Sequence, residues 1–177
     1  MRILVVVDDC TRECLALVPD TSISGIRVAR ELDRLLVAYG KPKTIVSDNG
    51  TELTSNAILS WADETGVGWH YIAPGKAQQN GFIESFNGRL RDELLNETLF
   101  TSLAHARAVL AAWKDDYNTV RPHSGLGNLP PAAYVQLSDS MMQRDGALRS
   151  IGGFAPHPVA PPSQTGSNDE RTPLIPG

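Results

Sequence analysis

The chain has 177 residues, of which 41% are hydrophobic, which is enough for one ordinary globular domain with its own core. Its formal net charge of −4 weighs against a broad nucleic-acid-binding surface, because such surfaces usually carry an excess of Lys and Arg. No window approaches the roughly 20 apolar residues of a membrane span, and Asp8 and Asp9 interrupt the apolar start too early for a signal peptide. We therefore expect a soluble, cytoplasmic protein with no membrane partner.

The N-terminal segment predicts a β-hairpin. Residues 2–7, RILVVV, are typical of a strand buried on both faces, and residues 13–18, ECLALV, of a second strand with Glu13 facing outward. Asp8 and Asp9 are metal-ligand candidates between these strands, but acids at hairpin turns are common and we favour the turn. Cys10 and Cys14 have no second cysteine pair and no histidine at zinc-ligand spacing, so we expect two reduced packing residues.

A helix and a short buried strand come next. Thr21 or Ser22 is placed to cap the helix, and Gly40 is placed to end it. The strand, residues 43–47, delivers Asp48 at its C-terminal end, where ligands collect in open α/β sheets. The apolar residues of the helix recur at helical spacing: Val28, Leu32, Leu35, Leu36 and Tyr39.

A second helix, with Ile58, Trp61 and Ala62 on its inner face, should end at Gly66. Residues 67–72 predict another strand, in which His70 is a packed or edge residue rather than a ligand. Glu52 is expected to be a helix-start acid that interacts with the helix dipole.

Residues 74–91, PGKAQQNGFIESFNGRLR, form a Pro/Gly loop that turns into an amphipathic helix, expected from near Asn80 to Asn96. Asn80, Asn87 and Arg91 lie four before, three after and seven after Glu84, so the four side chains share a helical face. A carboxylate, two amides and a guanidinium suit a metal ion and a phosphodiester better than a core.

A last helix, capped by Thr101 or Ser102, carries a core-facing stripe. Trp113 belongs to this stripe, and we interpret it as packing rather than as a base-stacking platform. Residues 117–134 contain many Pro and Gly and predict a loop. We therefore expect one domain over residues 1–137 and a disordered Pro/Gly/Ser-rich tail over residues 138–177. The core-facing stripe of the last helix consists of Leu103, Ala106, Leu110, Trp113 and Tyr117.

If the fold brings Asp48 and Glu84 together, their mutual repulsion would be relieved by a divalent cation with oxygen ligands, such as Mg²⁺. A pair of such ions can hold the attacking and leaving oxygens of a phosphoryl displacement. Spacing alone does not establish this arrangement, but phosphodiester chemistry is the natural hypothesis.

Four phrases, in order, resemble the integrase core of bacterial insertion-sequence transposases, which is similar to that of retroviral integrases. The resemblance covers roughly residues 2–137. It implies an α/β, ribonuclease H-like mixed sheet flanked by helices, and a DDE triad of acids that binds Mg²⁺ or Mn²⁺ while a DNA 3′ hydroxyl attacks a phosphodiester. It implies DNA and further copies of the transposase as partners, in a bacterial cytoplasm close to the nucleoid. The phrases are VVVDDCTRECLAL, IVSDNGTEL, PGKAQQNGFIESFNGRLRDELLN and WKDDYNTVRPHSGLGNLPPAAY.

By this resemblance, Asp48 of SDNG matches the second family acid and Glu84 of FIESFNG the third, both as catalytic metal ligands. The family's first acid lies on a strand before the hairpin, in a W-x-x-D-F phrase, whereas Asp8 and Asp9 match hairpin acids. The resemblance therefore implies a truncated core without its first strand, with an unpaired edge on residues 2–7.

The loop and helix around Glu84 supply candidate DNA contacts, because amides and cations reach phosphate oxygens readily. The alternative for Asn87 is ordinary solvation of the helix surface. The alternative for Arg91 is a surface ion pair with Glu84 or Glu93. The alternative function is an inactive transposase remnant that at most binds DNA or inhibits the intact enzyme. The candidate contacts are Lys76, Gln78, Asn80, Asn87 and Arg91.

Overall fold

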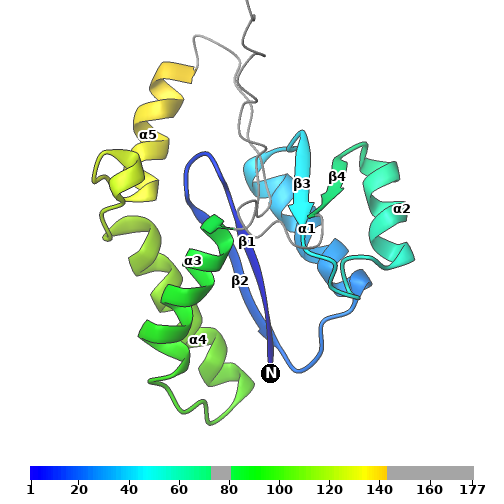
Figure 1. Ribbon diagram of the computed structural model, residues 1–177, viewed down its shortest axis with the longest axis horizontal. Coiled ribbons are helices and arrows are strands. Elements are labelled where there is room, and N and C mark those ends of the chain that lie inside the picture. Colours follow the sequence, from blue (N-terminus) through cyan, green and yellow to red (C-terminus); the bar gives the residue numbers. More distant parts are fainter. Residues whose placement is uncertain (73–80, 143–177) are drawn as a thin grey trace, which may run out of the picture.

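A computed structural model describes residues 1–72 and 81–142. A β-hairpin stands in the middle of the molecule, with one group of elements on each side of it (Figure 1). Helices α3, α4 and α5 lie on one side, and α1, α2, β3 and β4 lie on the other. The elements are β1 (Arg2–Val7), β2 (Cys14–Asp20), α1 (Gly25–Tyr39), β3 (Thr44–Ser47), α2 (Asn56–Thr65), β4 (Gly68–Tyr71), α3 (Gly81–Leu90), the π-helix η2 (Arg91–Leu95), α4 (Leu103–Thr119), the 3-10 helix η3 (Ser124–Leu126) and α5 (Pro131–Met142).

The hairpin has an apolar residue set on each face. Leu4 and Val6 of β1 pack into a first core with α1 and α2, whereas Val5 and Val7 pack into a second core with α3 and α4. Successive strand residues point to opposite faces, so the run of apolar residues in β1 serves both cores. The prediction of a strand with two packed faces is confirmed, but alternation with an outward Glu13 is wrong, because Glu13 precedes β2 and β2 is itself apolar on both faces.

The described strands form two separate two-stranded sheets. β1 and β2 pair antiparallel, with Val5 opposite Leu17, and β3 and β4 pair parallel, with Ile45 opposite Trp69. Within residues 1–72 and 81–142, no strand joins β1 to β3. Each of these two strands therefore keeps one edge free of β-pairing in the described structure, as the sequence predicted for residues 2–7.

The structure confirms the predicted ends of α1 and α2 and the predicted start of α4, but not the predicted start of α1. Gly40 ends α1 and Gly66, in the left-handed conformation, ends α2, as expected. Ser102 caps α4, and its hydroxyl accepts a hydrogen bond from the backbone N–H of His105. The cap of α1 is Ser24 rather than Thr21 or Ser22.

The C-terminal part differs from the expectation. Residues 131–142 form α5, where the sequence predicted a loop and then a tail beginning at residue 138. Pro131 is the first residue of α5, a position where the missing N–H of proline costs nothing because it has no helical acceptor. Residues 143–177 lie outside the described part of the chain, so disorder there stays a prediction.

Candidate active site

Asp48 follows β3 directly, and the loop after the strand fixes its position. Its Oδ1 accepts a hydrogen bond from the backbone N–H of Gly50 at 2.9 Å. A Cβ on residue 50 would lie only 3.0 Å from that oxygen. Glycine at this position therefore does more than allow a turn, since it leaves room for the Asp48 carboxylate.

Three further hydrogen bonds tie the loop to the sheet. The Ser47 hydroxyl donates to the backbone carbonyl of Asp48 at 3.0 Å and accepts from the Trp69 indole N–H at 3.0 Å. The Asn49 amide donates to the carbonyl of Ile72 at 3.0 Å. The loop therefore holds Asp48 in one place, although its side chain is exposed.

Glu84 lies in the first turn of α3. Phe86 and Leu90 anchor this helix in the second core, which leaves Glu84 and Asn87 on a different face. Glu84 is exposed and Asn87 is half-buried, and neither side chain forms a hydrogen bond or an ion pair with the described residues. Both polar groups are thus available to a ligand.

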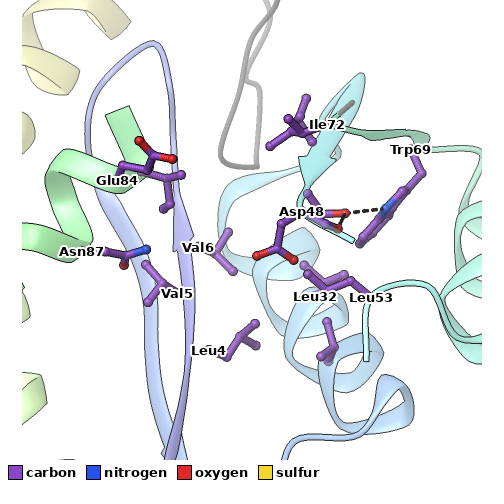
Figure 2. Close-up of a pocket in the computed structure, with 14 residues that line it drawn as sticks. Leu4, Val5, Val6, Leu32, Asp48, Leu53, Trp69, Ile72, Glu84 and Asn87 are labelled. Carbon is purple, nitrogen blue, oxygen red and sulfur yellow. Dashed lines mark hydrogen bonds between the residues drawn. The ribbon is translucent and has the colours of Figure 1, made fainter. Parts of the chain in front are cut away.

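One pocket brings these side chains together. Its volume is about 150 Å³, and Asp48, Glu84 and Asn87 all line it. Figure 2 shows Asp48 entering from the end of β3 and Glu84 and Asn87 from α3, on opposite sides of the pocket. Val5 and Val6 of β1 form part of the wall between them. Asp48 and Glu84 therefore line one pocket, and their pairing as catalytic metal ligands stays a prediction.

Of the other candidate DNA contacts, the structure describes only Arg91. Lys76, Gln78 and Asn80 lie outside the described residues. Arg91 is exposed at the start of η2 and does not line the pocket. Of its two expected ion-pair partners, Glu93 pairs with Arg121, and Glu84 forms no ion pair with the described residues.

The acids of the hairpin and of the loop before α2 have structural roles. Asp8 is buried, and its Oδ1 accepts hydrogen bonds from the backbone N–H groups of Cys10 and Thr11. Asp9 pairs with Arg12. Both acids therefore shape the turn, as we favoured, and neither lines the pocket.

Glu52 does not act as a helix-start acid. It precedes the first residue of α2 by four positions and forms an ion pair with Arg2 at 3.3 Å. The loop between β3 and α2 is longer than the sequence pattern indicated, which moves Glu52 out of reach of the first helical turn.

The donors at the pocket fit a divalent cation that prefers oxygen ligands. Two carboxylates and one amide oxygen are hard donors of the kind that Mg²⁺ and Mn²⁺ take. Among the described residues there is no group of three or more His, Cys, Asp and Glu side chains arranged to hold a metal. This part of the chain therefore supplies two acids to the pocket and no third.

Asn118 is a structural residue that the sequence patterns did not single out. Its Oδ1 accepts from the backbone N–H of Cys14 and its Nδ2 donates to the Cys14 carbonyl, both at 2.9 Å. This buried pair of bonds ties α4 to β2 and so holds the hairpin against the second core. A polar residue directly after the apolar stripe position Tyr117 is the signal that could have indicated it.

Comparisons with known proteins identify relatives of this chain. Two family models, both described as integrase core domain, match residues 1–77 and 65–131. The chain belongs to the integrase core family. A protein of insertion element IS407 from Burkholderia multivorans is 52% identical over 135 residues, which are 76% of this chain and 49% of the relative. A protein of insertion element IS476 from Xanthomonas euvesicatoria is 48% identical over 135 residues, 76% of this chain and 39% of the relative.

A more distant relative is named for its function: the transposase of insertion sequence IS904 from Lactococcus lactis is 33% identical over 56% of this chain and 42% of its own length. The chain spans half or less of the length of these three relatives. This chain is therefore similar in sequence to proteins of bacterial insertion elements.

The fold has a solved counterpart. The catalytic core domain of BIV integrase matches with a TM-score of 0.59 at 20% identity, over 80% of this chain and 90% of that chain. The predicted ribonuclease H-like architecture is confirmed. In the described residues the mixed sheet is divided into the hairpin and the β3–β4 pair, without a strand between them. No helix among the described residues is long and apolar enough to cross a membrane.

Proposed function

We propose that this chain contributes to DNA transposition as the catalytic core of a transposase, by metal-dependent phosphodiester cleavage and strand transfer. The observation that carries the proposal is the pocket between β3 and α3, which Asp48 and Glu84 both line from two elements far apart in sequence. The relatives from insertion elements support it. The substrate in this proposal is DNA, and the reaction takes place in the bacterial cytoplasm.

Asp48, Glu84 and Asn87 each have a defined role in this proposal. Asp48, positioned by Gly50, and Glu84, projecting from the first turn of α3, hold the cation between them. When bound, Mg²⁺ or Mn²⁺ supplies Lewis-acid activation of the phosphodiester. Asn87 lies one helical turn after Glu84 and orients a phosphate oxygen through its amide N–H.

The test is strand transfer with terminal-repeat DNA in Mg²⁺ or Mn²⁺, using the full-length reading frame of the element. Asp48→Asn and Glu84→Gln should each abolish product, because each replaces a charged ligand by a neutral isostere. Glu52→Gln is the matched control: it removes an acid four residues from Asp48 that pairs with Arg2 outside the pocket, and should retain activity. Strand transfer by either site variant at the parent rate would refute the assignment.

A second candidate function is favoured by one observation, the absence of a third acid at the pocket within the described residues. A chain with two ligands would bind the cation weakly, and would act by binding DNA or by mixing with intact transposase as an inhibitor. Titration calorimetry separates the two candidates. Heat on adding Mn²⁺ that disappears in Asp48→Asn supports a catalytic core, and no heat at millimolar Mn²⁺ supports the inhibitor.

A further inference from the structure

A second cavity lies on another face of α3. Its volume is about 230 Å³, far more than the roughly 10–15 Å³ that one water needs. Ser85 and Arg89 of α3 line this cavity, whereas Glu84 and Asn87 of the same helix line the first pocket. The two cavities therefore share a helix but not their polar groups.

The floor of the cavity contains a buried histidine whose hydrogen bonding is incomplete. His123 is 7% exposed, and its Nε2 has no hydrogen-bond partner in the described part of the chain. The ring also bonds to the backbone of Tyr117, so this bond must use the other nitrogen, Nδ1. Buried polar atoms are nearly always paired, so the free Nε2 is a hydrogen-bonding group available to a ligand that enters the cavity.

The wall of the cavity is positively charged. Arg89 is exposed and forms no ion pair with the described residues. Arg12 reaches the cavity from the hairpin turn, where it pairs with Asp9 and lies over the Phe82 ring at 4.3 Å from its centroid. Among the described residues that line the cavity there is no carboxylate, so the site disfavours cations and favours an anion.

Hydroxyl groups complete the set of donors. Ser85 of α3 and Ser124 of η3 both line the cavity, and neither side chain has a hydrogen-bond partner among the residues described. Guanidinium and hydroxyl groups are the usual donors to phosphate oxygens, and a tetrahedral phosphate accepts bonds from several directions at once. Here the donors come from three directions: α3, η3 and the buried ring of His123.

We propose that this cavity binds a phosphate group, held by Arg89, Ser85, Ser124 and the Nε2 of His123. With Nδ1 bonded to the backbone carbonyl of Tyr117, a neutral ring leaves Nε2 as an acceptor. A phosphodiester carries no proton to donate, so its binding requires protonation at Nε2, which turns this atom into a donor. The phosphate belongs to a nucleic-acid backbone or to a small phosphate compound.

Binding of a phosphodiester should therefore be stronger at lower pH. The charged groups around His123 are Arg89 of α3, Arg12 of the hairpin turn and Arg121 after α4, and together with burial they lower the pKa of its ring. Arg121 is itself neutralised by Glu93 and Asp116, and Arg12 by Asp9. A bound phosphate offsets the remaining positive charge and stabilises the imidazolium.

The experiment is an NMR titration of the protein in EDTA, which removes metal chemistry, with the ring resonance of His123 as the readout. Inorganic phosphate and a short single-stranded oligonucleotide are the two probes. His123→Gln identifies the resonance among the four histidines of the chain. We expect the bound oligonucleotide, whose phosphodiesters carry no proton, to shift this resonance at pH 6 more than at pH 8. Inorganic phosphate can donate its own proton to the neutral ring, so it should shift the resonance at both pH values.

Arg89→Ala should weaken binding about tenfold, because it removes a charge-assisted hydrogen bond from an exposed position without disturbing the core. Ser85→Ala, also at an exposed position, should weaken it less. Arg30→Ala is the matched control, since Arg30 is exposed on α1, away from both cavities, and should bind as the parent does.

The two probes separate the sources of the phosphate. A response to both, or to the oligonucleotide alone, assigns the cavity to a nucleic-acid backbone; a response to inorganic phosphate alone assigns it to a small phosphate compound. No shift at His123 with either probe, or equal affinity in the parent and Arg89→Ala, overturns the proposal. In the Asp48→Asn background the phosphate response should persist, so the outcome is independent of the transposase assignment.

Discussion

Two cysteines only four positions apart have different surroundings. Cys14 is completely buried, and burial raises the pKa of its thiol to about 12. Cys10 is exposed in the hairpin turn, where partial burial together with Asp8 and Asp9 raises its pKa. The sequence prediction of a packing role is confirmed for Cys14 and wrong for Cys10, because the turn projects Cys10 outward.

We therefore predict that iodoacetamide at pH 8 modifies Cys10 in the folded protein and modifies Cys14 only after unfolding in guanidinium. The thiolate is the reactive species, and a buried thiol with a raised pKa supplies almost none. Peptide mass spectrometry after timed quenching measures both rates. Modification of the two thiols at the same rate in native buffer would contradict the burial of Cys14.

His123 gives the stability of the protein a pH dependence with a definite sign. Its pKa is lowered in the folded state by burial and by three nearby guanidinium groups. The unfolded chain, with a histidine pKa of about 6.5, therefore takes up a proton first as the pH falls. This contribution to stability is present above pH 6.5 and is lost as the pH drops toward the folded pKa.

We predict that the free energy of unfolding decreases from pH 7 to pH 5, and that His123→Gln decreases less over the same range. Urea denaturation at four pH values, with the parent measured in parallel, gives both slopes. Added phosphate should reduce the loss at pH 5.5 in the parent and not in His123→Gln. Identical slopes in the two proteins would show that His123 does not titrate in this way.

At the scale of elements, Asn118 joins α4 to β2 through both backbone groups of Cys14. We predict that Asn118→Ala lowers the free energy of unfolding by about 2–4 kcal/mol, because it leaves a buried N–H and a buried carbonyl unpaired. Asn96→Ala, at an exposed position after η2, is the control and should change stability by less than about 0.5 kcal/mol. Urea denaturation followed by circular dichroism measures both values, and similar losses would refute the role of Asn118.

The sequence predicts an element best where the periodic run of apolar residues stops at a residue that favours a helix boundary. Gly40 and Gly66 end their helices as predicted, and Ser102 begins α4. The errors arise where a local hydrogen bond competes with the pattern. The Asp20 carboxylate accepts from the backbone N–H of Thr21, so α1 starts only after Ser24.

The candidate sites also differ in how far the sequence predicts them. Asp48 and Glu84 were predictable because each ends or begins an element whose period is clear and whose motif is specific. The second cavity, which we propose binds phosphate, was not predictable, because Arg12, Arg89 and His123 come from three segments that no pattern places side by side. Only the packing of α3 between the hairpin turn and η3 brings them together.

At the scale of the whole molecule, Asp48 and Glu84 belong to the two different groups of elements on either side of the hairpin. A cation held by both would link the two groups, and any ligand of the folded state raises its stability, by about 2.7 kcal/mol at a concentration of 100 Kd. We predict that Mn²⁺ raises the Tm of the parent and of Glu52→Gln but not of Asp48→Asn or Glu84→Gln. Differential scanning calorimetry measures this, and an equal rise in all four proteins would indicate binding elsewhere.

The division of the strands into two sheets has a consequence for association. β1 and β3 each have one edge without a β-partner in the described structure, and residues of both line the same pocket. Unpaired strand edges present rows of N–H and C=O groups that pair readily with another extended chain. Leu4, Val5 and Val46 add apolar surface along these edges.

We predict that the protein self-associates at tens of micromolar concentration through the β1 edge, and that Leu4→Lys suppresses this association, because a charged side chain at the edge opposes strand pairing. Val37→Lys is the control for the added charge: Val37 is 89% exposed on α1, so this variant introduces the same lysine away from the edge and outside both cores. Sedimentation velocity over a concentration series measures association, after circular dichroism confirms that both variants fold. A monomeric parent throughout the series, or equal suppression by both variants, would show that the β1 edge does not drive association.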